Sequence, residues 1–103
     1  MKFGILTTGL LIAIGFASPV RAENAEHVKQ LLETKNCRGC DLTGAQLAGT
    51  NLSGADLSGA NLSSANLNGA NLNEARLNQA NLNQAQLQGA SLIAATMHGI
   101  NFE

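Results

Sequence analysis

The sequence predicts an all-β solenoid that follows a short N-terminal helix. Apolar residues recur at every fifth position from 42 to 102, a small residue stands two positions before almost every one of them, and glycine occupies seven of the twelve positions two residues after them. Trp and Tyr are absent, and aromatic residues make up 3% of the 103-residue chain. A core built on large aromatic side chains is therefore excluded.

The first predicted element is an export signal at residues 1–22. A basic start at Lys2 is followed by an uncharged apolar run over 3–16, which is shorter than the ~20 residues that a membrane-spanning helix needs. A small-residue site ending at Ala22 comes next, so we expect cleavage after Ala22. The mature chain is then expected outside the cytoplasm, with no stable membrane insertion.

A helix is predicted over 23–36. Val28, Leu31 and Leu32 lie on one apolar stripe at helical spacing. A helix of this length is marginal by itself, so the stripe must rest on the segment that follows. We expect residues 23–39 to form a helical cap and a junction, with the three apolar side chains packed on the first coil.

From residue 40 the chain has a period of five, which neither regular element can accommodate. On an α-helix, five residues advance about 140° beyond a full turn, so the apolar residues would bury no common face. On a straight strand, an odd period places successive apolar residues on opposite faces. A bend in every unit, with glycine at the corner, points all of them inward. The predicted core ladder is Leu42, Leu47, Leu52, Leu57, Leu62, Leu67, Leu72, Leu77, Leu82, Leu87, Leu92, Met97 and Phe102.

The repeating unit resembles that of the pentapeptide-repeat family, which consists of Ala, then Asp or Asn, then Leu and two variable residues. Runs such as Ala55-Asp56-Leu57-Ser58-Gly59 and Ala60-Asn61-Leu62-Ser63-Ser64 carry the resemblance, which extends over 40–103. The resemblance implies a right-handed quadrilateral β-helix with four units per coil and about three coils.

Residues 20 apart are then expected to stack. Asp56 would lie one layer from Arg76 and form an exposed ion pair worth about 0–1 kcal/mol. A second column would contain Asp41, Asn61, Asn81 and Asn101.

The two ends of a solenoid need caps, and the sequence offers one only at the N-terminal end. The last coil is more apolar than the others. Two interpretations stay open for it: simple core filling, or contact with a partner protein or with a second copy in a homodimer. The candidate interface residues are Ile93, Met97, Ile100 and Phe102.

The motif Cys37-Arg38-Gly39-Cys40 allows several interpretations. A c-type haem site requires His after the second cysteine, where Asp41 stands. A thioredoxin-like site requires a helix after the pair, whereas here the predicted helix precedes it. A structural disulfide between Cys37 and Cys40, tying the cap to the first coil, is favoured in an oxidising compartment. A buried free thiol at Cys40 stays open.

The sequence offers no other chemistry. His27 and His98 lack a third ligand, so we expect two solvated histidines and no metal site. No nucleophile–base set can be placed, and we expect no catalytic residue, no cofactor and no enzymatic activity. The net charge of −1 lacks the basic footprint of a nucleic-acid-binding protein.

These observations favour a non-enzymatic structural or protein-interaction module with an unidentified protein partner. Small exported members of the family in cyanobacteria imply the periplasm or the thylakoid lumen as its location. One alternative is a redox-responsive protein that switches through Cys37 and Cys40. Another is a DNA-mimicking topoisomerase inhibitor, as some members of the family are, but the chain is short, weakly charged and predicted to be exported away from DNA.

Overall fold

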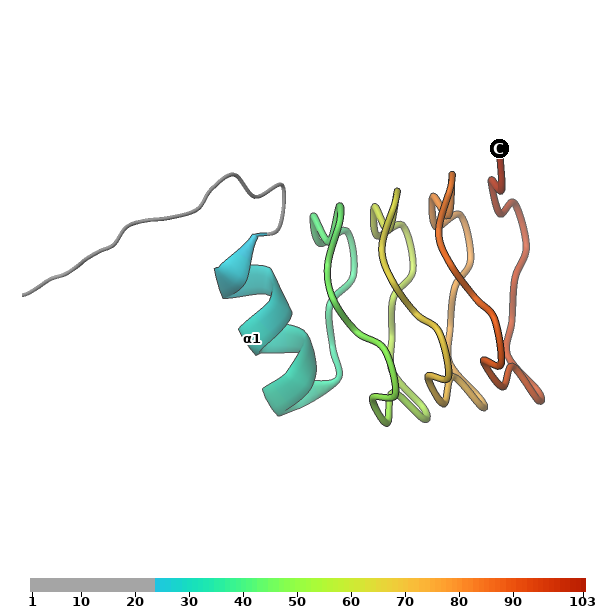
Figure 1. Cartoon of the computed structure of the whole chain (residues 1–103), viewed down its shortest axis with the longest axis horizontal. Helices are drawn as coiled ribbons and strands as arrows, with labels where there is room; N and C mark the ends of the chain where they lie inside the picture. The colour runs from blue at the N-terminus through green and yellow to red at the C-terminus, as the bar shows by residue number, and fades with distance from the viewer. Residues whose placement is uncertain (1–23) are drawn as a thin grey trace, which may run out of the picture.

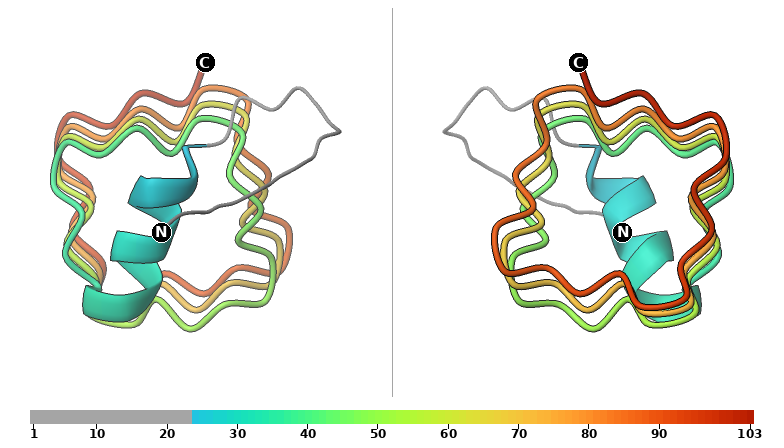
Figure 2. Two further views of the ribbon diagram at one scale, coloured as in Figure 1. Left: turned by 90° about the vertical axis from the view of Figure 1, so that its left-hand side faces the viewer. Right: turned by 90° about the vertical axis from the view of Figure 1, so that its right-hand side faces the viewer.

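The computed structural model describes residues 24–103, and the predicted export signal at 1–22 lies outside the described residues. One helix, α1 (Ala25–Thr34), precedes a chain that winds as a stack of coils (Figure 1). Viewed along the stack, the coil has a four-sided outline, and α1 lies across one of its open ends (Figure 2).

Isolated parallel β-bridges fix the register of the coils. Each bridge joins residues 20 apart, beginning with Asn36 and Asp56. Every coil therefore contains four five-residue units. The coils span 36–55, 56–75 and 76–95, and a fourth begins at 96.

A hydrogen-bonded turn forms each corner of the outline. In the unit of Leu57, the N–H of Ala60 donates to the Leu57 carbonyl oxygen at 3.0 Å. The third residue of each turn has a positive φ, which is the signature of a type II turn. Glycine fills seven of these twelve corner positions between 44 and 99, and the other five are held by Ser64, Glu74, Gln79, Gln84 and Ala94.

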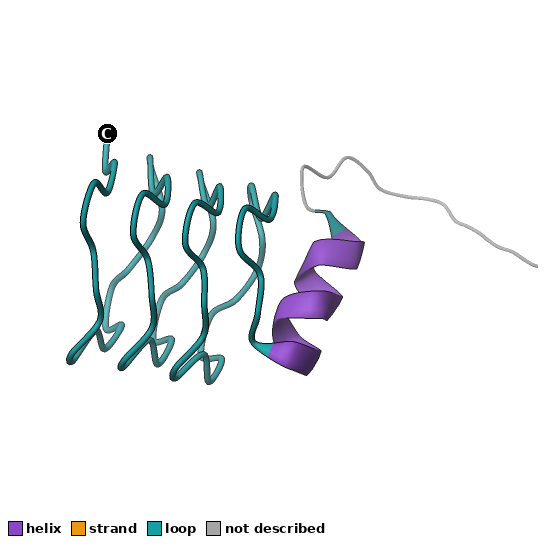
Figure 3. Ribbon diagram, turned by 180° about the vertical axis from the view of Figure 1, so that it is seen from behind, coloured by secondary structure: helices purple, strands orange, loops and turns teal. Residues whose placement is uncertain are grey.

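The strands of this solenoid are reduced to single bridged residues. Between residues 24 and 103, no continuous strand forms, and Figure 3 draws the coils entirely as loop and turn. The hydrogen-bonded turn takes four of the five residues in each unit, as from Leu57 to Ala60, so one residue per side, here Asp56, is left for the bridge. The all-β prediction therefore holds for the pairing pattern but not for strand length.

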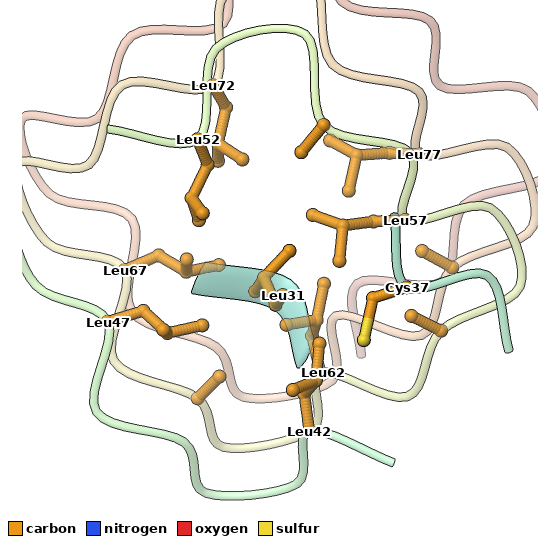
Figure 4. Packing of buried hydrophobic residues seen from close by; sticks show 14 of the residues in the cluster. Leu31, Cys37, Leu42, Leu47, Leu52, Leu57, Leu62, Leu67, Leu72 and Leu77 are labelled. Atoms are coloured by element: carbon orange, nitrogen blue, oxygen red, sulfur yellow. The ribbon is translucent and has the colours of Figure 1, made fainter. Parts of the chain in front are cut away.

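The axis of the coil is a dry ladder of leucines. The nine central leucines from Leu42 to Leu82 are at most 2% exposed, and alanines fill the small positions between them except at Thr50. Figure 4 shows the leucines from Leu42 to Leu77 pointing into the coil. Burial of each leucine contributes about 2 kcal/mol. Leu87 and Leu92 are half-buried, whereas Met97 and Phe102 at the same ladder positions are exposed.

The N-terminal boundary differs from the prediction in two ways. α1 ends at Thr34, where Lys35 adopts the left-handed conformation with φ 59°. The coil then begins at Asn36, four residues earlier than expected, so Cys37 takes the first central position. The sequence pattern concealed this unit because cysteine replaces leucine at its centre.

Only part of the predicted apolar stripe of α1 faces the coil. Leu31 is fully buried over the coil axis (Figure 4), and Val28 packs against the same core. Leu32 is 50% exposed, so its predicted packing on the first coil is wrong. The reason is geometric, since consecutive helical residues are about 100° apart and Leu31 already points at the axis.

Candidate functional site

The two ends of the coil are the places where the repeating backbone ladder stops. Within the coil, the N–H of Asn61 donates to the carbonyl oxygen of Cys40, and the N–H of Asn81 donates to that of Ala60. The first and last coils each have one edge without such a neighbour. A buried or half-buried backbone group needs another partner there.

Side chains of α1 supply these partners at the N-terminal edge. The N–H of Asp41 donates to Nδ1 of His27 at 2.8 Å. Nε2 of Gln30 donates to the carbonyl oxygen of Asn36 at 2.9 Å. The N–H of Asn36 donates to Oγ1 of Thr34 at 3.0 Å. The helix thus replaces a preceding coil through three polar side chains as well as through Leu31.

The sequence did not identify these three capping residues. The sequence predicts a solvated His27, whereas the residue is half-buried and its ring is bonded to the coil. Gln30 and Thr34 carry no pattern in the sequence. Their partner groups are backbone atoms of the first coil, at sequence separations of up to 14 residues. No local motif records such pairs, whereas the N-cap Asn24, which accepts from the N–H groups of Glu26 and His27, follows an ordinary capping preference.

Cys37 and Cys40 form a disulfide in the structure. Both residues are buried, and the bond spans the first turn of the coil, between its first central position and the following small position. It therefore closes a turn within the first coil, whereas we predicted that it would tie the helix to the coil. The contact with α1 is made by Sγ of Cys37, which lies 3.4 Å from the carbonyl oxygen of His27.

A small ion cluster lies on one side of the coil. Oδ2 of Asp56 is 3.3 Å from the Arg38 guanidinium and 3.9 Å from that of Arg76, the stacked partner that the repeat predicted. Partial burial tends to raise the pKa of Asp56. The hydrogen bonds from Ser58 and the Arg38 guanidinium outweigh it, so the pKa lies below its ordinary value. Both arginines are largely exposed, so each pair adds little stability.

The bridged Asp and Asn residues stabilise the corners that follow them. In the predicted column of Asp41, Asn61, Asn81 and Asn101, successive residues are bridged. Oδ1 of Asp41 accepts from Oγ1 of Thr43 at 2.7 Å and from its N–H at 3.2 Å. These bonds, the hydroxyl bond first, hold the pKa of the Asp41 carboxyl below its ordinary value. The same local bond explains why Asp and Asn recur at this position of the unit.

The edge that faces away from α1 is apolar. We call it the C-terminal edge and define it by Leu87, Leu92, Met97 and Phe102. Met97 is 38% exposed and Phe102 56%. Of the other predicted interface residues, Ile93 points outward at 71% exposure, whereas Ile100 packs against the core.

Backbone groups are also left free along the C-terminal edge. The N–H groups of Leu87, Gly89 and Leu92 have no hydrogen-bond partner within residues 24–103. Their equivalents one coil earlier, such as the N–H of Leu67, donate to the next coil. This edge therefore combines apolar side chains with unpaired donors, the combination that strand addition uses.

Outside the two edges, the surface of α1 is hollowed. A shallow hollow of about 460 Å³ runs along α1 and is lined by Glu26, Lys29, Glu33 and their neighbours. In the part of the chain that the structure describes, no three His, Cys, Asp or Glu side chains converge as metal ligands. Over the same residues, no helix has the length and apolar character needed to cross a membrane.

Fold and site together define a solenoid of stacked five-residue units with one capped end. The family model for pentapeptide repeats, which describes a run of eight copies, matches the chain twice, over residues 36–73 and 70–103. The chain belongs to the pentapeptide-repeat family. Proteins of this family fold as right-handed quadrilateral β-helices and are generally structural or interaction modules that are not enzymes.

Several solved structures are similar to the chain. HetL of Nostoc sp. strain PCC 7120, involved in heterocyst differentiation regulation, is 40% identical over 58% of this chain and 31% of its own, with a TM-score of 0.40. A second Nostoc pentapeptide repeat protein is 27% identical over 84% of this chain and 100% of its own, with a TM-score of 0.45. One from the Arabidopsis thaliana thylakoid lumen is 33% identical over 58% of this chain and 46% of its own, with a TM-score of 0.35.

The chain spans about a third of the length of HetL. No curated protein matches it.

Proposed function

We propose that the protein is an exported, non-enzymatic interaction module of the periplasm or thylakoid lumen, and that its C-terminal edge binds a second copy of the same chain. The observation that carries the proposal is the contrast between the two ends of the coil. α1 covers the N-terminal edge with Leu31 and three hydrogen-bonding side chains. The C-terminal edge exposes Met97 and Phe102 beside unpaired backbone donors.

The shape of the C-terminal edge favours a second copy as its partner. The unpaired groups follow a four-sided outline with a five-residue spacing. A single extended peptide can pair with one side of that outline, whereas another coil can pair with all four. Because α1 covers the opposite end, the two coils must meet through their C-terminal edges. Such a contact is isologous and closes as a dimer.

The charge distribution supports the same conclusion. Residues 77–102 contain no Asp, Glu, Lys or Arg, and His98 is the one histidine in this segment. Two copies can therefore approach through this edge without strong like-charge repulsion. A partner recruited by opposite charge has little to recognise here.

The test is the oligomeric state of the protein in solution, measured by sedimentation equilibrium over a range of concentrations. We expect a reversible dimer for the wild type and a monomer for Met97→Lys and Phe102→Glu. Leu32→Lys is the matched control, since Leu32 is a similarly exposed apolar residue on α1, and this variant should remain dimeric.

Two results would count against the proposal. A wild type that is monomeric at every concentration excludes self-association through the edge. A dimer that Leu32→Lys disrupts and Phe102→Glu leaves intact places the contact on α1. Crosslinking in the native compartment followed by mass spectrometry then tests for a different protein partner, and the location of the crosslinked protein tests the proposed export.

The disulfide has a structural role in this proposal. Cys37 is fully buried and Cys40 is 4% exposed, and reduction of a disulfide requires access of a thiolate to one of its sulfurs. Burial of both residues favours a permanent crosslink of the first turn over a redox switch.

A further inference from the structure

His27 is a titratable group whose single hydrogen bond to the coil requires one protonation state. Its Nδ1 accepts from the backbone N–H of Asp41 at 2.8 Å. An imidazole nitrogen accepts a hydrogen bond only when it carries no proton. The neutral ring must therefore hold its proton on Nε2, and a second proton on Nδ1 turns the acceptor into a donor that faces another donor.

Within residues 24–103, no other hydrogen bond joins the first turn of α1 to the coil. The other hydrogen bonds between α1 and the coil come from Gln30 and Thr34 and end at Asn36, close to the point where the helix joins the coil. The bond between His27 and Asp41 joins residues 14 apart and holds the opposite end of the helix. Beside it, Sγ of Cys37 contributes only a contact with the His27 carbonyl oxygen.

We propose that His27 is a pH-sensitive latch, whose protonation releases the first turn of α1 from the coil and uncovers the N-terminal edge at Asp41. The ring of histidine ordinarily titrates near pH 6.5. The bond to the Asp41 N–H exists only while Nδ1 of His27 carries no proton. The latch is therefore closed while the ring is neutral, and a second proton on the ring opens it.

Protonation of another charged group near His27 must be distinguished from protonation of its ring as a cause of helix release. Glu26, Lys29 and Glu33 border the same hollow on α1, and from the coil the Asp41 carboxylate acts on His27. Carboxyl groups of Asp and Glu ordinarily titrate near pH 4, and the Lys ammonium titrates near pH 10. The range from about pH 7.5 to about pH 5 lies between these two classes of group and is the range in which histidine rings ordinarily change charge.

One competing interaction acts against release. The Asp41 carboxylate attracts a protonated His27, although its Oδ1 already accepts twice from Thr43. This attraction could keep the ring near the coil in a new arrangement. It cannot restore the bond to the Asp41 N–H, because a protonated ring has no acceptor.

The experiment is nitrogen-15 NMR of the full chain with amide hydrogen exchange, as protection factors, from about pH 7.5 to about pH 5. We expect the Nε2–H tautomer of His27 at the upper pH. At the lower pH we expect a loss of protection of about fivefold to tenfold at the Asp41 amide, the factor that one hydrogen bond represents. The amides of α1 should lose protection together with it, whereas the Leu62 amide in the second coil should not.

Three variants separate the latch from other causes. His27→Asn places an amide oxygen where Nδ1 stood and cannot be protonated, so protection should become independent of pH. His98→Asn changes the other histidine of the described chain, in the last coil, and should retain the wild-type response. Asp41→Asn removes the carboxylate while keeping the backbone N–H, and the response should persist.

The proposal fails if nitrogen-15 NMR of the wild-type chain shows that neutral His27 carries its proton on Nδ1. It also fails if the Asp41 amide keeps the same protection across the pH range, if His27→Asn still responds, or if Asp41→Asn abolishes the response. Each outcome is independent of the oligomeric state, so it is distinguishable from a failure of the proposed dimer.

Discussion

Gly54→Ala isolates the conformational cost of one corner of the coil. Gly54 has φ 74°, within the left-handed region, and a Cβ at this position meets no other heavy atom within 4 Å. The added methyl group therefore encounters no neighbouring side chain or coil. What changes is the strain of holding an L-residue in this conformation.

The expected loss of stability follows from two opposing contributions. The left-handed conformation costs an L-residue about 1–2 kcal/mol. Alanine also restricts the unfolded chain, which returns about 0.4–1 kcal/mol. The net destabilisation is about 1 kcal/mol. In a domain of this size, that lowers the melting temperature by about 4–8 °C.

Thermal unfolding followed by circular dichroism and calorimetry measures this shift. Gly54→Asn should lose less, because asparagine tolerates the left-handed region better than alanine. Ser53→Ala, at the preceding turn position without a positive φ, should leave the melting temperature nearly unchanged. A Gly54→Ala variant that melts at or above the wild-type temperature would refute the turn geometry, as would an equal loss in Ser53→Ala.

Further predictions concern the core, the disulfide and the ion cluster. Leu62→Ala empties a fully buried ladder position and should lower the free energy of unfolding, measured with denaturant, by about 3–5 kcal/mol. Leu92→Ala, at a half-buried position, should cost less than half as much. Equal losses would contradict the burial gradient along the ladder. Reducing the bond between Cys37 and Cys40 should remove about 2 kcal/mol of stability. Replacing both residues by serine should cost more than reduction, because each buried hydroxyl needs a hydrogen-bond partner. Thiol trapping in the native compartment should find the pair permanently oxidised. Because the pKa of Asp56 is lowered in the fold, its contribution is present above about pH 4 and is lost as the pH falls through the folded value; Asp56→Asn should flatten this acid limb of the stability curve.

Much of the architecture could be predicted because the same local features recur in every five-residue unit. The five-residue period, the inward leucines and the glycine corners are local features that repeat along the chain. The stacked neighbours Asp56 and Arg76 also followed, once the resemblance gave four units per coil. The first unit escaped prediction because Cys37 replaces leucine at its centre. The reduction of each strand to one bridged residue was also missed, since periodicity gives no length to a strand.

The sequence by itself determined that this chain must bend at every fifth residue, because no straight helix or strand can bury a period of five on one side. Only the tertiary structure decided how the coil is closed. In the structure, Leu31 points to the coil axis and Leu32 to solvent, and His27 accepts a hydrogen bond from the backbone of Asp41. A repeated pattern acts through near neighbours and accumulates along the chain. The cap depends on a few pairings between distant residues, each of which occurs once and leaves no period to detect.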